Sequence, residues 1–147
     1  MAQLAKVETK VPLKGSSDQF FTFFRNNIPN LHQMFPQNVQ SVEVVGGGEV
    51  KTGSVLHAKY SLAGSPVMSA KIKIEALDDA RKSMSVVVLE GDLFQLYKTF
   101  KVKMEVSAGQ AKWSIEFEKA NENAPHPSPY LDLITKVCKG LDAHLSV

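Results

Sequence analysis

The stretch FKVKMEV, residues 100–106, and the stretch KWSIEFE, residues 112–118, carry the repeat that decides the fold. Apolar and polar side chains alternate in both, a period of two that is typical of β-strands with one buried face. Gly109 lies between the two stretches and predicts a turn. We therefore expect neighbouring antiparallel strands, with Phe100 and Trp113 on the buried face.

The same alternation recurs on the amino-terminal side of this pair. It predicts further strands over residues 3–13, 39–45, 53–62, 68–75 and 84–89. Turn-forming residues between these segments predict turns at Gly46–Gly48, Ala63–Pro66 and Glu90–Asp92. Six or seven strands joined by short turns form an antiparallel sheet. Because each strand is apolar on one face only, one face of that sheet is buried.

Two short helices are predicted between the first two strands. Ser16 and Gln19 have the spacing of a capping box, which favours a helix that begins there. Pro29 suits the first turn of a second short helix, and Pro36 ends it. The aromatic residues expected on the buried side of the first helix are Phe20, Phe21, Phe23 and Phe24.

Towards the C-terminus the period changes to that of a long helix. Ser128 is expected to cap this helix, with Pro129 at its first position. Gly140 inside it predicts a bend or close packing, because glycine costs about 1 kcal/mol relative to alanine in a helix. The predicted buried stripe is Tyr130, Ile134, Val137, Leu141 and Leu145. The side predicted to face away from the core carries Asp132, Lys136, Lys139 and Asp142.

One helix covers only a strip about 10 Å wide, so it fills the concave side of a long curved sheet poorly. Either large aromatic side chains occupy the remaining space or a cavity persists. Inward side chains such as Ala58, Ala70 and Val86 are medium-sized or small, which favours a cavity of the kind that binds small molecules. The residues predicted to line it and contact the ligand are Leu56, Ala58, Tyr60, Met68, Ile72, Met84, Val86, Val88, Phe100, Val102, Trp113, Ile134, Val137 and Cys138.

The composition restricts the class of protein. The chain has 147 residues, 44% of them hydrophobic and 22% charged, which is typical of one globular domain over residues 1–147. The net charge of +2 is too small to favour nucleic acid or an anionic membrane surface as a partner. We expect a cytoplasmic protein, because no signal peptide, membrane span or lipidation motif is recognisable and the one cysteine fits a reducing compartment.

No combination of residues for metal or phosphate chemistry stands out. The four histidines lack metal-ligand spacing, so neither a metal nor a cofactor is predicted. The glycines between Gly46 and Gly53 depart from the Walker pattern around Lys51 and favour a flexible turn. Cys138 lies beside the apolar stripe of the last helix, which favours a buried thiol over a nucleophile.

Tyr60 and Tyr97 are the two weak catalytic candidates, and the catalytic set is otherwise unknown. Tyr60 continues an inward face, whereas Tyr97 lies where the alternation of its strand slips, so that a bulge can aim it either way. A functional interpretation has each hydroxyl bind a ligand carbonyl or transfer a proton. The alternative interpretation is a core aromatic residue with its hydroxyl at the rim.

Five segments that together span most of the chain carry a family resemblance. They are VLHAKYSLAG from Val55, KIEALDDARKSMS from Lys73, LEGDLFQLYKTFKV from Leu89, KWSIEFEKANEN from Lys112 and YLDLITKVCKGLDAHL from Tyr130. These segments resemble the major latex protein family, within the birch-pollen-allergen-like, START-like helix-grip superfamily. The resemblance implies an α+β fold: a seven-stranded curved antiparallel sheet gripping a long C-terminal helix, two short helices after the first strand, and an internal cavity for hydrophobic plant metabolites.

The chain departs from that family at two predicted inward positions and in one loop. Similar proteins often carry tryptophan where this chain has Ala58 and commonly an acidic residue where it has Ile72. The glycine-rich loop, VGGGE over residues 45–49, lacks the acidic and aromatic residues often found there. Inward-facing, Ala58 enlarges the cavity and Ile72 makes it more apolar, which favours a hydrophobic ligand over a cationic alkaloid. The lysine and carboxylates of amine-condensing relatives are not recognisable here.

Two classes of function remain open. The first is a carrier or reservoir for a terpenoid- or sterol-like plant metabolite, active in defence or specialised metabolism. The second is a cofactor-free cyclase or isomerase that holds a reactive terpenoid of the iridoid type, or an alkaloid intermediate, in a productive conformation and excludes water. The expected partners are a small hydrophobic ligand and biosynthetic enzymes, without nucleic acid or a membrane span. The expected state is a monomer or a weak dimer.

Overall fold

The computed structural model describes residues 4–62 and 66–145 of the chain. Within these ranges the strands are β1 (Leu4–Pro12), β2 (Val39–Val44), β3 (Val55–Tyr60), β4 (Met68–Asp78), β5 (Ser83–Gly91), β6 (Tyr97–Ser107) and β7 (Gln110–Lys119). The helical segments are α1 (Ser17–Asn26), the 3₁₀ turn η1 (Ile28–Asn30), α2 (Leu31–Met34), the 3₁₀ turn η2 (Asp92–Gln95) and α3 (Ser128–Leu145). The start of the predicted first strand, Gln3, and most of the predicted turn at 63–66 lie outside the described residues.

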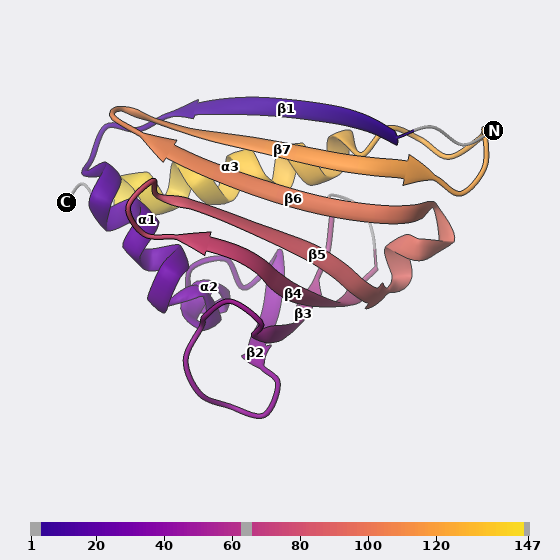
Figure 1. The fold of residues 1–147 in the computed structure, drawn as a ribbon, viewed down its shortest axis with the longest axis horizontal. Coiled ribbons are helices and arrows are strands. Elements are labelled where there is room, and N and C mark those ends of the chain that lie inside the picture. The colour runs from indigo at the N-terminus through magenta and orange to yellow at the C-terminus, as the bar shows by residue number, and fades with distance from the viewer. Residues whose placement is uncertain (1–3, 63–65, 146–147) are drawn as a thin grey trace.

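The strands of the described residues form one antiparallel sheet in the order β1-β7-β6-β5-β4-β3-β2. The sheet curves around α3, which runs along its concave side, while α1 and α2 gather near the C-terminal end of α3 (Figure 1). This architecture confirms the predicted α+β fold, in which a seven-stranded antiparallel sheet grips a C-terminal helix and two short helices follow the first strand.

The two stretches that decide the fold pair as β6 and β7. Phe100 lies opposite Phe117 and Met104 lies opposite Trp113, so large apolar side chains meet on the concave face. Gly109 makes the connection with a φ of +79°, a backbone conformation that glycine adopts without steric cost. The alternation of apolar and polar residues therefore predicts correctly which face of each strand is buried.

A bulge at the start of β6 settles the direction of Tyr97. The pairing of β6 with β7 shifts register between Tyr97 and Thr99. The extra residue turns the Tyr97 side chain into the core, where it is only 2% exposed. The slip in the sequence pattern is therefore a bulge that aims this tyrosine inward.

The segment after β5 differs from the sequence prediction. In place of a turn at Glu90–Asp92, β5 continues to Gly91 and the 3₁₀ turn η2 begins at Asp92. The Asp92 carboxylate accepts a hydrogen bond from the Ser69 backbone N–H at 2.8 Å, and Leu93 is buried. Four residues are too few to show a helical period in a sequence, so this element escapes a pattern-based prediction.

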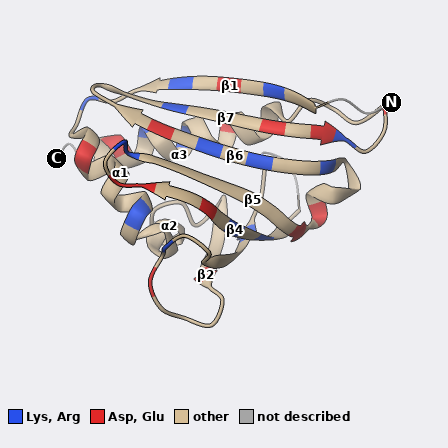
Figure 2. Ribbon diagram, in the orientation of Figure 1, with Lys and Arg blue, Asp and Glu red and all other residues tan. Residues whose placement is uncertain are grey.

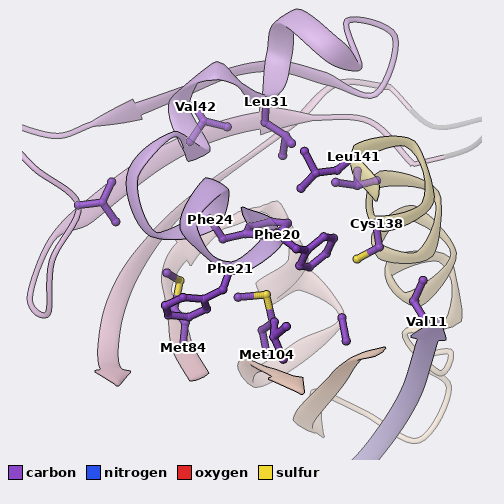
Figure 3. Packing of buried hydrophobic residues seen from close by; sticks show 14 of the residues in the cluster. Val11, Phe20, Phe21, Phe24, Leu31, Val42, Met84, Met104, Cys138 and Leu141 are labelled. Carbon is purple, nitrogen blue, oxygen red and sulfur yellow. The ribbon is translucent and has the colours of Figure 1, made fainter. Parts of the chain in front are cut away.

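The N-terminus of α1 follows the sequence prediction. The Ser16 hydroxyl oxygen accepts a hydrogen bond from the Gln19 backbone N–H at 3.2 Å, which satisfies one of the free donors of the first turn. The aromatic rings of this helix enter the space between α3 and the sheet (Figure 3). Phe23 is partly buried, and the fully buried rings are Phe20, Phe21 and Phe24.

Asp142 of α3 is buried, although the sequence predicts that it faces solvent. Asp142 was predicted to face away from the core, but it is only 7% exposed. Its carboxylate accepts hydrogen bonds from the backbone N–H groups of Lys14 and Gly15, at 2.8 and 2.9 Å. Because these donors belong to the connection between β1 and α1, which is 127 residues or more away in sequence, helical periodicity alone does not indicate the contact.

Two further details of α3 concern its start and its packing. The helix begins at Ser128, one residue before the predicted first position, Pro129. A Cβ atom added at Gly140 would lie 2.6 Å from Cζ of Phe35. The sequence predicts either a bend or close packing at Gly140, and the structure shows close packing against the Phe35 ring.

The outer face of the sheet is a mixed charged surface. Figure 2 shows acidic and basic residues distributed over β1, β7, β6 and β4. Cross-strand ion pairs join Lys101 to Glu75 at 2.7 Å and Lys112 to Glu8 at 3.1 Å. The two signs of charge are interleaved, as expected for a solvated face rather than a nucleic-acid-binding stripe. No helix in the described part of the chain combines the length and the apolar character needed to cross a bilayer.

Candidate ligand-binding cavity

A cavity of about 240 Å³ lies between the concave face of the sheet and α3, closed at one end by the short helices. Its wall exposes apolar atoms almost exclusively. Other depressions, of about 350 to 410 Å³, are formed by charged side chains of the outer face and of α1 and by the loop that follows β2. The pocket with the apolar wall is the candidate site, because ligand pockets are concave and mainly apolar.

Most of the residues predicted to contact the ligand border this cavity. Those on its wall are Ala58, Tyr60, Ile72, Met84, Val86, Val88, Phe100, Val102, Trp113, Ile134 and Val137. Ala58 and Ile72, the two positions at which the chain departs from similar proteins, both lie on the wall. The wall is therefore wider and less polar than one with tryptophan and a carboxylate at these positions.

Three predicted residues do not belong to the wall. Leu56 and Cys138 are fully buried in the packed core, and Met68 packs against a second cluster that includes Tyr60 and Phe100. Strand alternation and the helical stripe indicate which side chains point inward. They do not indicate which inward side chains meet one another and which meet a void.

Sequence reasoning missed the contribution of the short helices and of several neighbouring strand positions. The additional residues on the wall are Phe24, Ile28, Leu31, Val39, Val42, Ala70, Leu93, Met104, Tyr130 and Leu133. For Phe24 and Tyr130 a signal existed, since both lie on predicted buried faces. For Ile28 and Leu31 there was none, because η1 and α2 are too short for a helical period.

The wall carries two hydroxyl groups, and they bind each other. The hydroxyl oxygens of Tyr60 and Tyr130 are 2.5 Å apart, and the two rings are in edge contact with centroids 5.8 Å apart. Burial raises the pKa of both phenols above the ordinary value, and for Tyr130 the hydrogen bond to Tyr60 raises the pKa further. Both groups are therefore neutral near pH 7 and neither is a base.

Tyr97, the other catalytic candidate, does not border the cavity. Its hydroxyl donates a hydrogen bond to the carbonyl oxygen of Pro125 at 2.8 Å. Its ring contacts Phe100 and Phe117, with centroids 5.4 and 5.7 Å away. Burial raises the pKa of this phenol as well. Tyr97 thus joins β6 to the segment that precedes α3.

The indole nitrogen of Trp113 lies behind the wall and faces the thiol of Cys138. Among the described residues it is the one buried side-chain nitrogen or oxygen without a hydrogen bond of ordinary geometry. Burial raises the pKa of the Cys138 thiol to about 12, and the Trp113 N–H opposes this rise in part. A thiol with so high a pKa is not a nucleophile near pH 7.

Charged groups do not reach the cavity in the part of the chain that the structure describes. Its wall includes no aspartate, glutamate, histidine, lysine or arginine. Within residues 4–62 and 66–145, no group of three or more histidine, cysteine, aspartate or glutamate side chains is placed to hold a metal ion. The described wall therefore consists of apolar side chains together with Tyr60 and Tyr130.

A curved sheet closed by one long helix around an apolar cavity defines the helix-grip class of proteins. Residues 2–147 match the sequence profile of the pathogenesis-related protein Bet v 1 family, and the chain belongs to that family. Within it, the chain is 32% identical to MLP-like protein 43 of Arabidopsis thaliana, over 97% of this chain and 93% of the relative. It is 29% identical to major latex protein 146 of Papaver somniferum, over 97% and 91%. The predicted family is confirmed.

Solved structures agree with this assignment. The crystal structure of ginseng major latex-like protein 151 from Panax ginseng superimposes with a TM-score of 0.91 at 31% identity, covering 96% of this chain and 97% of the other. Norcoclaurine synthase from Thalictrum flavum, in complex with dopamine and hydroxybenzaldehyde, superimposes with a TM-score of 0.72 at 16% identity, covering 97% and 89%. At 16% identity, the likeness to norcoclaurine synthase shows a shared fold only.

Proposed function

We propose that the protein binds a compact hydrophobic plant metabolite in the cavity between α3 and the sheet and serves as its carrier or reservoir. The observation that carries the proposal is a pocket of about 240 Å³ with an apolar wall. Each buried methylene contributes about 0.8 kcal/mol, so a ten-carbon guest gains about 8 kcal/mol, which corresponds to a Kd of about 1 μM.

The volume narrows the size of the ligand. An apolar cavity of about 150 Å³ holds benzene, and sites for drug-sized ligands begin at about 300 Å³. The cavity lies between these values, which favours a guest on the scale of a ten-carbon terpenoid over a sterol. Of the two ligand types that the family resemblance suggests, the terpenoid is therefore the one we propose.

The alternative of a cofactor-free cyclase or isomerase has less support. It needs mainly a cavity that holds the substrate in a productive conformation, and the version with a proton donor uses Tyr60 or Tyr97 to polarise a carbonyl group of the substrate. The Tyr97 hydroxyl binds Pro125 and the Tyr60 hydroxyl binds Tyr130. The likeness to norcoclaurine synthase is at 16% identity, which supports a common fold and no common activity.

The proposal places the carrier in the cytoplasm, in plant defence or specialised metabolism. A single cysteine allows no internal disulfide, which fits a reducing compartment. The relatives from Arabidopsis thaliana and Papaver somniferum are plant proteins, which fits a plant setting. Biosynthetic enzymes that produce or consume the ligand are the partners that such a carrier would meet.

Limonene, a ten-carbon terpene hydrocarbon, provides the test. Protein added to a sealed vial lowers the headspace concentration of limonene, which gas chromatography measures, in proportion to the amount bound. We expect saturable depletion with one site per chain and a Kd in the micromolar range. Depletion that rises linearly with limonene and never saturates would contradict the proposal.

A further inference from the structure

We infer that the cavity selects hydrocarbons and discriminates against their oxygenated analogues. This inference rests on the proposed function and names the chemical class of ligand that the site takes. It follows from the polar groups near the cavity in the described residues: the tyrosine hydroxyls are hydrogen-bonded within the protein, and the Trp113 indole nitrogen has almost no accessible surface.

The Tyr60–Tyr130 pair is the first of these groups. The two hydroxyl oxygens lie 2.5 Å apart, so one donates to the other. The rings of both residues border the cavity, yet the wall exposes almost no polar atom. The oxygens are therefore turned towards each other and contribute almost no surface to the cavity.

Two further polar groups lie close to the wall and are also unavailable. The Tyr97 hydroxyl donates to the Pro125 carbonyl oxygen at 2.8 Å. The indole nitrogen of Trp113 has less than 1 Å² of accessible surface and faces the Cys138 thiol rather than the void. Among the described residues, the wall thus offers a ligand oxygen almost no exposed polar atom.

The consequence is a selectivity that resembles that of an alkane solvent. A carbonyl or hydroxyl group leaves its hydrogen bonds to water when it enters the site and gains none in return. One ordinary hydrogen bond from the protein would improve Kd by about fivefold. If an oxygenated ligand binds more than about fivefold tighter than its partition into an alkane predicts, the protein must supply a hydrogen bond to it.

Limonene and carvone test this inference, since they share one carbon skeleton and carvone adds a carbonyl group. Kd is measured for both by headspace depletion, and the ratio is compared with the ratio of their water–hexadecane partition coefficients. We expect the two ratios to agree within about fivefold. Carvone that binds more than about fivefold tighter than hexadecane partition predicts overturns the inference. Failure of both compounds to bind contradicts the proposed function instead.

A pair of variants supplies the matched control. Tyr60→Phe/Tyr130→Phe removes both hydroxyls beside the cavity, and Tyr97→Phe removes one hydrogen-bonded hydroxyl away from it. We expect the same ratio of carvone Kd to limonene Kd in both variants and in the wild type. A selective loss of carvone affinity in the double variant, beyond about fivefold, assigns the pair to ligand binding and overturns the inference. If the double variant does not fold, the wild-type ratio alone decides.

Discussion

Ala58 of β3 lies directly opposite Ala70 of β4, and both side chains border the cavity. Two small residues side by side on neighbouring strands leave room that larger pairs would fill. The small size of both side chains keeps this part of the concave face open. It also marks the place where the chain departs from similar proteins that often carry tryptophan.

A large side chain at Ala58 is expected to weaken ligand binding. Ala58→Trp places an indole in the cavity, so we expect the Kd for limonene to rise at least tenfold, since a guest that loses two buried methylenes loses about 1.6 kcal/mol. Headspace depletion measures the Kd, and circular dichroism checks that the variant folds. Ala76→Trp, an exposed position on β4, is the matched control and leaves Kd unchanged. Unaltered limonene binding in Ala58→Trp would place the site elsewhere.

Asp142 holds the C-terminal part of α3 to the connection after β1. Asp142→Ala leaves the Lys14 and Gly15 backbone donors without their carboxylate, so we expect the free energy of unfolding to fall by about 3 kcal/mol. Urea denaturation followed by fluorescence measures the change. Asp132→Ala, at an exposed position of the same helix, changes it by less than about 0.5 kcal/mol. Equal effects of the two substitutions would show that the buried carboxylate has no special role.

Gly140 reverses the usual rule for glycine in a helix. Alanine normally stabilises such a position by about 1 kcal/mol, but here its Cβ would lie 2.6 Å from the Phe35 ring. We expect Gly140→Ala to lower the free energy of unfolding in the wild type and to raise it in a Phe35→Ala background. A double-mutant cycle measured by urea denaturation gives the coupling between the two sites. Additive effects would contradict the packing explanation.

Cys138 is expected to be unreactive in the folded protein. Burial holds the thiol pKa at about 12, so the thiolate fraction at pH 8 is negligible. Ellman's reagent therefore labels the protein only after urea unfolds it. Labelling of the native protein as fast as that of the unfolded chain would show that the thiol is accessible.

The same thiol links stability to alkaline pH. The folded pKa lies above the unfolded value of about 9, so the neutral thiol stabilises the fold at low pH. This contribution is fully present below pH 9 and is lost as pH rises towards 12, at up to about 1.4 kcal/mol per pH unit. Cys138→Ala removes this part of the slope between pH 9 and 10, measured by urea denaturation. An identical slope in wild type and variant would refute the assignment.

The sequence predicts the parts of this molecule that follow a period. Alternation identifies β6 and β7 with their buried faces, and the spacing from Tyr130 to Leu145 identifies α3. Contacts between segments distant in the chain have no such signal. The Asp142 carboxylate meets Lys14 and Gly15 only because the fold brings them together.

For the candidate site, the sequence predicts which side chains point inward but not which of them border the cavity. Inward strand residues such as Ala58 and Ile72 follow from alternation, because a strand residue has only two faces. Whether an inward side chain borders a void depends on what packs against it, which is why Leu56 and Cys138 belong to the solid core. Ile28 and Leu31 reach the wall from helical segments too short to show a period.

A crystal structure of the protein soaked with limonene tests the central claim most directly. We predict electron density for one terpene molecule in the cavity, enclosed by Ala58 and Ile72 on the sheet and by Ile134 on α3. An interior filled by its own side chains, with the terpene absent or bound on the outer surface, would contradict the account.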